Sequence, residues 1–177
     1  IPKNEADFEK MCAHVYGVVF DDKLPKINGR KGQSQKGVDV YVSHKGHGKV
    51  GIQCKKYYKT TLTLKHVQEE VAKADAGHQP ISCLLIATVS PSDATIQQEV
   101  QRISEERTAA GKFDVTVDFW DDIENRVFQY PILQERYAPH SAGGMFYRVE
   151  KSLDEVKAHT SSLPARMQGL EETLGNA

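Results

Sequence analysis

Three polar residues, Asp39, Gln53 and Lys55, stand at spacings that can bring them together on one face of a β-hairpin. Residues 38–42 alternate in the manner of a strand, and residues 49–55 follow a turn as its partner strand. Side chains two positions apart on a strand share a face, so Gln53 and Lys55 point the same way and the turn places Asp39 beside them. The pattern therefore predicts a carboxylate, a carboxamide oxygen and an ammonium on one side of a sheet.

Such a group of side chains suits metal-assisted hydrolysis of a phosphodiester. Mg²⁺, for which Mn²⁺ can substitute, takes oxygen ligands, commonly one or two carboxylates together with water and substrate phosphate. We expect Asp39 to anchor the ion, with the side-chain oxygen of Gln53 and the backbone carbonyl of Cys54 as further ligands. The metal would acidify a water and neutralise phosphate charge. Lys55 would orient or help to deprotonate that water and stabilise the transition state.

Asp39 is also the only acid in a long basic stretch. Residues 23–65 hold eleven Lys and Arg residues and one acid, a local charge of +10 in a chain of net charge −1. A solvated face normally mixes both signs, so this block predicts a surface that binds a polyanion; an exposed lysine-rich loop is the alternative. The nucleic-acid contacts are expected at the rim of the site, from Arg30, Lys31, Gln33, Ser34, Gln35, Lys36, Lys56, Tyr57 and Lys59. A plain flexible loop over residues 33–36 and packing of Tyr57 at a strand end are the alternatives there.

Hydrophobic periodicity predicts the elements that must position these residues. Helices are predicted from the N-terminus to near Gly17 and over residues 64–76, 94–110 and 121–127, and strands over residues 38–42, 49–55, 81–88 and 113–119, with a loop over residues 26–36. Thr63, Asp93 (or Ser92) and Asp121 are the expected N-caps. This order predicts an α/β fold, a mixed sheet of about four or more strands with helices on both faces.

The runs over residues 37–41 and 50–57 resemble the D…QxK version of the PD-(D/E)xK motif, which is typical of Mrr-like restriction endonucleases. The likeness covers about residues 5–137 and takes in Arg30–Gln33, Ile86–Thr88 with Asp93 and Gln97, and residues 113–123. It implies a restriction-endonuclease-like fold and Mg²⁺-dependent endonuclease activity on double-stranded DNA. The chain also looks like the nuclease modules of bacterial anti-phage and STAND-type defence proteins.

The same resemblance implies a fourth site residue. In such enzymes an acidic residue of the first helix often completes the metal site, and Glu9 matches that position. The chain departs from the general motif at Gln53, where an acid is more usual, which leaves Asp39 as the one carboxylate of the motif. A catalytically silent DNA-binding domain of the same fold is the alternative function.

The expected domain organisation is a nuclease domain over residues 1–138, a linker over 139–144 and a helical tail over 145–177, in two segments separated at Pro164. Apolar residues at helical spacing in the tail predict a homodimer or larger assembly, formed through the tail or through a further domain. No apolar run is long enough to span a membrane. Three cysteines without a CxxC pair predict reduced thiols and a cytoplasmic location.

Two weaker interpretations stay open. His44, His47 and Cys54 are candidates for a zinc site, although no fourth ligand has a suitable spacing. Glu69 and Glu70 follow on the helix after Lys55, and we interpret them as solvated residues, one of which could instead approach the metal.

Overall fold

The computed structural model describes residues 2–29, 37–46, 48–57, 61–77 and 79–175, and within the C-terminal helix it describes side chains as far as Ser161. The chain forms two compact units, Ile1–Arg126 and Val127–Ala177. This division falls earlier than the predicted boundary at residue 138. The predicted domain limits stay a prediction.

The first unit is built around a five-stranded mixed sheet in the order β1-β2-β3-β4-β5. Its strands are β1 (Lys26–Ile27), β2 (Val40–His44), β3 (Gly48–Lys55), β4 (Cys83–Thr88) and β5 (Asp114–Asp118). Neighbours among β1, β2 and β3 are antiparallel, and β3, β4 and β5 are parallel. The predicted mixed α/β sheet is confirmed. The loop predicted over residues 26–36 is wrong at its start, because Lys26 pairs with Tyr41, and a two-residue strand is too short to show a period.

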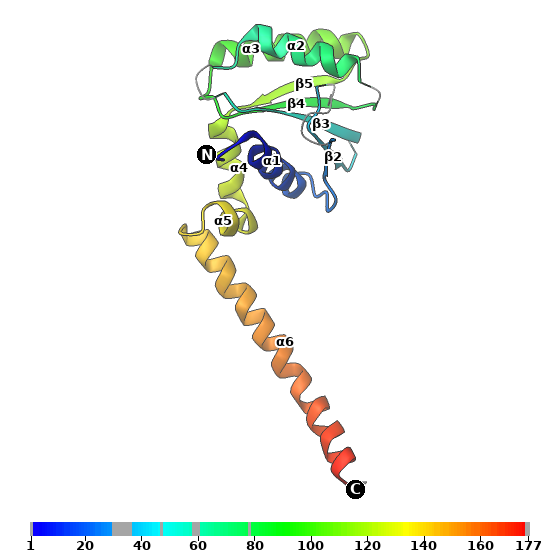
Figure 1. Cartoon of the computed structure of the whole chain (residues 1–177), viewed down its shortest axis with the longest axis vertical. Helices are drawn as coiled ribbons and strands as arrows, with labels where there is room; N and C mark the ends of the chain where they lie inside the picture. Colours follow the sequence, from blue (N-terminus) through cyan, green and yellow to red (C-terminus); the bar gives the residue numbers. More distant parts are fainter. Residues whose placement is uncertain (1, 30–36, 47, 58–60, 78, 176–177) are drawn as a thin grey trace. The chain divides into compact units, whose positions relative to one another are not determined.

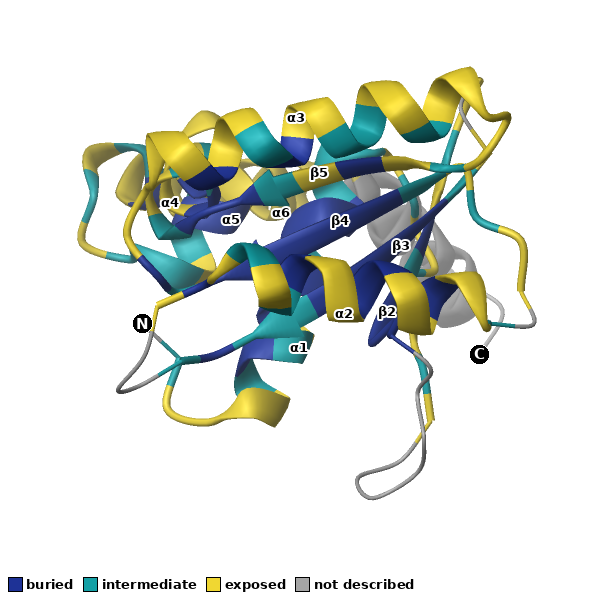
Figure 2. Ribbon diagram, turned by 90° about the horizontal axis from the view of Figure 1, so that it is seen from above, coloured by how far each residue is buried: buried dark blue, intermediate teal, exposed yellow. Residues whose placement is uncertain are grey.

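Helices cover both faces of this sheet, as predicted. α1 (Glu5–Val19) lies on one face, and α2 (Leu64–Asp75) and α3 (Ala94–Ala109) lie on the other (Figures 1 and 2). The Thr63 side chain accepts a hydrogen bond from the His66 backbone N–H, and Asp93 accepts from those of Thr95 and Ile96, so both side chains are N-caps. β4 is buried along most of its length, which accounts for its continuous apolar sequence.

The helices of the second half differ from the prediction. α4 (Trp120–Gln129) begins before Asp121, so the prediction that Asp121 is its N-cap is wrong. The Asp122 carboxylate accepts the Phe119 backbone N–H at 2.9 Å, and Asp121 accepts the Ser92 hydroxyl at 3.1 Å. Pro131 begins a helix that was not predicted, α5 (Pro131–Tyr137), where the missing N–H has no intrahelical partner to lose.

α6 (Ala142–Gly175) is a single helix, so the predicted separation at Pro164 is wrong. A proline removes one backbone donor, and good helix formers such as Ala165 and Arg166 follow it. Among the described residues, no helix combines the length and the apolar character needed to cross a bilayer.

A buried polar cluster joins β5 to the helices of the first unit. The Tyr16 hydroxyl of α1 donates to Asp118 Oδ2 at 2.8 Å, and the Arg126 guanidinium donates to both oxygens of Asp118, at 2.6 and 3.1 Å. Tyr16 is fully buried and Asp118 is nearly so. Because a buried carboxylate is costly without partners, these contacts fix α1 and the last turn of α4, which carries Arg126, to the end of β5.

We predict that Asp118→Ala lowers the free energy of unfolding by about 3 kcal/mol, since it leaves the Arg126 charge and the Tyr16 hydroxyl without their acceptor. Urea unfolding followed by circular dichroism measures the change. Asp114→Ala, on the same strand but exposed, is the matched control and should change stability far less. Equal effects of the two substitutions would contradict the role given to Asp118.

Candidate active site

The β2–β3 pair brings Asp39 and Gln53 into direct contact. Val40 lies opposite Ile52, and the Asp39 backbone N–H donates to the Ile52 carbonyl at 2.8 Å, so the antiparallel pairing extends to Asp39. The Gln53 side-chain amide donates to Asp39 Oδ2 at 2.6 Å, and the Cys54 backbone N–H donates to the same oxygen at 2.7 Å. Asp39 and Gln53 keep only 3% and 6% of their surface exposed. The hairpin thus holds a buried carboxylate in a position fixed by two hydrogen bonds.

Lys55 ends β3 two residues beyond Gln53, and its side chain is mostly buried. Its ammonium forms an ion pair with Glu70 Oε1 at 2.9 Å, and the Lys73 ammonium contacts the same oxygen at 2.7 Å. The Glu70 side chain is only 5% exposed. The interpretation of Glu70 as a solvated helix residue is therefore wrong.

Glu70 is a neighbour of the site that the sequence patterns left as a weaker alternative. A signal for it was present, because Val67, Val71 and Ala74 define the inner face of α2 and residue 70 lies among them at spacings of three, one and four. A glutamate on an otherwise apolar helix face needs a partner, and Lys55 together with Lys73 supplies one. Glu69, its neighbour in sequence, stays half-exposed.

The environment of Asp39 favours its protonated form. Burial is the largest cause, and it raises the pKa of Asp39 from 3.8 to about 6. The carboxylates of Glu9 and Glu70 add to the rise, while the Cys54 N–H and the Lys55 ammonium oppose it. An added positive charge at this place would stabilise the ionised carboxylate.

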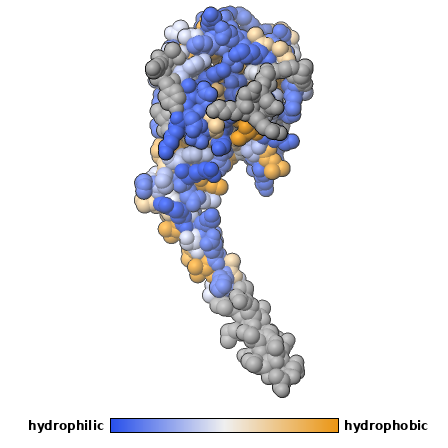
Figure 3. All heavy atoms as spheres, viewed as in Figure 1, coloured by the Kyte–Doolittle hydropathy of each residue, from blue (hydrophilic) through white to orange (hydrophobic). Residues whose placement is uncertain are grey.

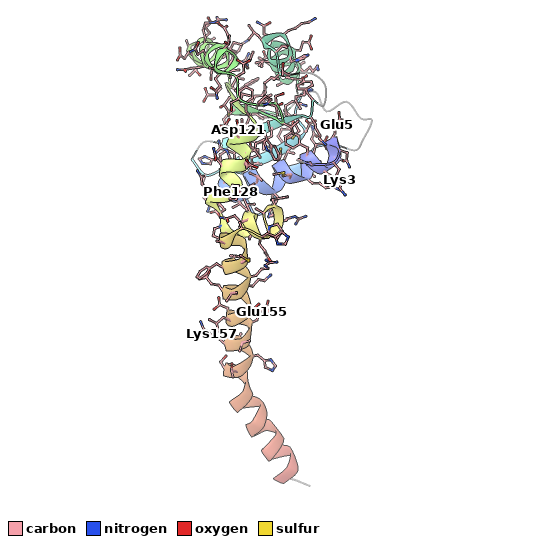
Figure 4. All side chains as sticks on the ribbon, turned by 90° about the vertical axis from the view of Figure 1, so that its left-hand side faces the viewer. Lys3, Glu5, Asp121, Phe128, Glu155 and Lys157 are labelled. Carbon is pink, nitrogen blue, oxygen red and sulfur yellow. The ribbon has the colours of Figure 1, made fainter. Side chains whose placement is uncertain are left out.

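Glu9 of α1 belongs to the same neighbourhood. Burial is the main cause of the raised pKa values of Asp39 and of the Cys54 thiol, and the charge of Glu9 adds to both. The pKa of Glu9 itself is raised, first by partial burial and then by Glu5, which lies close to the start of α1 (Figure 4). Glu9 therefore adds negative charge to the surroundings of the Asp39 carboxyl, and its part in a metal site stays a prediction.

The donor set fits a hard cation. Gln53 Oε1 is buried and has no hydrogen-bond partner among the described residues, which is costly for an amide oxygen unless something positive approaches it. Both hydrogen bonds that Asp39 accepts from described residues are made to Oδ2. No group of three His, Cys, Asp or Glu side chains that could hold a metal occurs in the described part of the chain. A cation here would therefore use the Gln53 amide oxygen beside the carboxylates of Asp39 and Glu9, an all-oxygen set of the kind Mg²⁺ takes.

The predicted DNA contacts are only partly visible. Arg30, Lys31, Gln33, Ser34, Gln35, Lys36 and Lys59 lie outside the described residues, as does His47 of the zinc hypothesis. Lys56 is buried and donates to the Pro2 carbonyl. The Tyr57 ring stacks on the His66 ring, with centroids 5.0 Å apart. The role of these residues in DNA binding stays a prediction.

The raised pKa of Asp39 gives a signed pH dependence in metal-free protein. Between pH 4 and 6 the folded chain keeps a proton on Asp39 that the unfolded chain releases, so the free energy of unfolding falls as pH rises through this window, by at most about 3 kcal/mol. Asp39→Asn should remove this fall when urea unfolding is measured at several pH values with a chelator.

Asp75 supplies a control of opposite sign. Its ion pair with Arg107, at 2.7 Å, lowers the pKa of Asp75. The stability from that pair is present above the ordinary Asp pKa and is lost as pH falls. Asp75→Asn should therefore change the free energy of unfolding at low pH. The decrease between pH 4 and 6 that is assigned to Asp39 should remain. An unchanged pH curve for Asp39→Asn would contradict the raised pKa.

Comparison with known proteins gives one match. A family model described as restriction endonuclease (Mrr_cat) matches residues 4–109, more than half of the chain. The matched part contains Glu9, Asp39, Gln53, Lys55 and Glu70. No curated protein matches the chain, and no solved structure matches it. The chain belongs to this restriction endonuclease family, and its mixed-sheet unit is a restriction-endonuclease-like nuclease domain that acts on DNA.

Proposed function

We propose that this chain is a Mg²⁺-dependent endonuclease of the D…QxK type that hydrolyses phosphodiester bonds in double-stranded DNA. The observation that carries the proposal is the buried Asp39–Gln53 pair, with an amide oxygen that lacks a partner and with the Lys55 ammonium two residues further along the same strand. A buried carboxylate and an unpaired amide oxygen can bind a metal ion, and the neighbouring ammonium can act on the phosphate. These are the components of metal-assisted phosphoryl transfer.

Each residue has a separate part in this reaction. Asp39, Gln53 and Glu9 would hold the ion, together with the Cys54 backbone carbonyl. Mg²⁺, or Mn²⁺ in its place, supplies Lewis-acid chemistry at the scissile phosphate and makes water more acidic. Lys55 orients the attacking water and stabilises the negative charge that grows on the phosphate. The Asp39–Gln53 hydrogen bond keeps the amide turned so that its oxygen stays available as an acceptor.

We predict that the wild-type chain nicks plasmid DNA with Mg²⁺ or Mn²⁺ and that EDTA abolishes the nicking. Asp39→Ala and Lys55→Ala should each lower the cleavage rate about 100-fold or more, because each removes a charge used in the transition state. Lys49→Ala is the matched control, since Lys49 lies on the same strand and contacts Gln79 at 3.1 Å instead of the site.

The alternative function, a catalytically silent DNA-binding domain, gives a different result in the same assay. A silent domain would bind duplex DNA with the salt dependence of phosphate contacts and would show no metal-dependent nicking. Cleavage by Asp39→Ala or Lys55→Ala at the wild-type rate would also contradict the catalytic assignment.

We further propose that the domain is the effector of a bacterial anti-phage defence protein and acts in the cytoplasm. The resemblance of its motif to nuclease modules of STAND-type defence proteins supports the first part. The three cysteines, all free, support a reducing compartment.

Self-association through α6 is also part of the proposal. Phe146, Val149, Leu153 and Val156 are 65%, 66%, 51% and 61% exposed, and their alternating three- and four-residue spacing is that of a coiled-coil seam. The same register continues in the sequence at Leu163, Met167, Leu170 and Leu174, with the polar Thr160 between. A repeat sustained over about four heptads fits a second copy of the same helix. Apolar patches are visible on α6 in Figure 3, and charged residues such as Glu155 and Lys157 project from it in Figure 4.

We predict that the full chain is a dimer at micromolar concentration and that Leu153→Asp makes it a monomer, because an acid at the seam would be buried without a partner. Ala158→Asp introduces the same charge at an outer position of the heptad and should leave the dimer intact. Sedimentation velocity measures all three masses. A monomeric wild type, or a Leu153→Asp variant that stays dimeric, would rule out this seam.

A further inference from the structure

We infer that Glu70 is a positioning residue that holds the Lys55 ammonium at the active site, with Lys73 as its second counter-ion. The inference rests on the proposed function, because it assigns how the catalytic lysine of that site is kept in place. It concerns a residue of α2, outside the hairpin that carries the motif.

The geometry shows a single acceptor oxygen shared by two ammonium groups. Glu70 Oε1 lies 2.9 Å from Lys55 Nζ and 2.7 Å from Lys73 Nζ. The Lys55 side chain is 22% exposed and the Lys73 side chain is 53% exposed. Lys55 is thus held on the inner side of the carboxylate and Lys73 on its solvent side.

Charge balance explains why two lysines are needed. An ionised carboxylate as buried as that of Glu70 is costly unless it is paired, and its two partners lower its pKa despite the burial. With both lysines protonated the cluster keeps a net charge of +1. Glu70 can therefore locate the Lys55 ammonium without cancelling the positive charge that a phosphate would meet.

Packing around Gly37 sets the distance between α2 and the hairpin. Gly37 has a positive φ of 77°, and a Cβ placed there would lie 2.8 Å from Lys73 Cβ, 2.9 Å from the Ala74 nitrogen and 3.0 Å from the Glu70 carbonyl oxygen. The backbone two residues before Asp39 therefore touches the turn of α2 that carries Glu70 and Lys73. The close contact between Gly37 and α2 therefore helps to position both the Asp39 carboxylate and the Glu70 carboxylate that accepts from Lys55.

The rest of the α2 face argues against a purely packing role. Val67, Val71 and Ala74 on this face join the apolar core between α2, α3 and the sheet. An apolar residue at position 70 would extend that core without the cost of burying a charge. A carboxylate is useful here because it can hold an ammonium in one geometry.

The test compares Glu70→Gln with Glu69→Gln in the full chain. Under single-turnover conditions with Mg²⁺, Glu70→Gln should slow DNA cleavage about 10- to 100-fold, since small displacements of a catalytic group have effects of this size. The DNA Kd and the Mg²⁺ midpoint should stay at their wild-type values. Glu69→Gln makes the same chemical change one residue away, at a half-exposed side chain 4.0 Å from Lys65, and should cleave like wild type.

A double-mutant cycle separates positioning from stability. In the Lys55→Ala background, Glu70→Gln should cause no further loss of cleavage, because the group that it positions is gone. An equal loss in both backgrounds would overturn the inference and assign Glu70 a structural role. Wild-type cleavage by Glu70→Gln would overturn it too.

A second measurement does not depend on activity. In metal-free protein the ¹⁵N-detected ammonium resonance of Lys55 should be visible in the wild type and lost in Glu70→Gln, while it persists in Glu69→Gln. If the wild type cleaves no DNA, the proposed function fails, and this resonance still tests the Lys55–Glu70 pairing. An unchanged resonance in Glu70→Gln would refute the pairing even where the wild type cleaves.

Discussion

The burial of one carboxylate, that of Asp39, is the constraint on which the organisation of this domain depends. Its oxygen accepts a side-chain N–H from Gln53 and a backbone N–H from Cys54, so β2 and β3 must keep their register for the pair to exist. A register shift of one residue would turn Gln53 to the opposite face of the sheet. Burial raises the pKa of Asp39 to about 6 although the Cys54 N–H and the Lys55 ammonium both lower it. Burial thus destabilises the ionised form of Asp39, and a bound cation would stabilise that form.

Charge in this protein is arranged in space rather than along the chain. Asp39 is the only acid between residues 23 and 65, yet the folded chain brings acids from both sides of that block to its lysines. Lys45 pairs with Asp21 at 2.7 Å, and Lys55 pairs with Glu70 at 2.9 Å. The exposed Lys45 pair contributes little to stability, whereas the buried pair at Glu70 sets a geometry. A charge count along the sequence therefore overstates the free positive charge of the surface.

The longest and most regular elements of the fold are the ones whose limits the sequence predicts best. Long amphipathic helices with side-chain caps, such as α2 behind Thr63 and α3 behind Asp93, were predicted close to their observed limits because local hydrogen bonds and a repeated apolar face define them. The sequence does not predict β1 or α5, because segments of two and seven residues are too short to show a hydrophobic periodicity. Asp121 and Asp122 are compatible with several first residues for α4. In the fold Asp122 accepts the Phe119 N–H and Asp121 accepts the Ser92 hydroxyl, and the helix begins at Trp120.

The hairpin and three polar residues of its site could be read from local sequence, because strand alternation and a turn are short-range properties. Asp39, Gln53 and Lys55 needed no knowledge of distant contacts to be placed on one face. The partners of these residues depended on the packed fold. Glu70 meets Lys55 because α2 lies against the sheet at Gly37, and Gln53 Oε1 is buried where no donor among the described residues reaches it. Burial and contact across elements arise from packing, and no period along the chain encodes them.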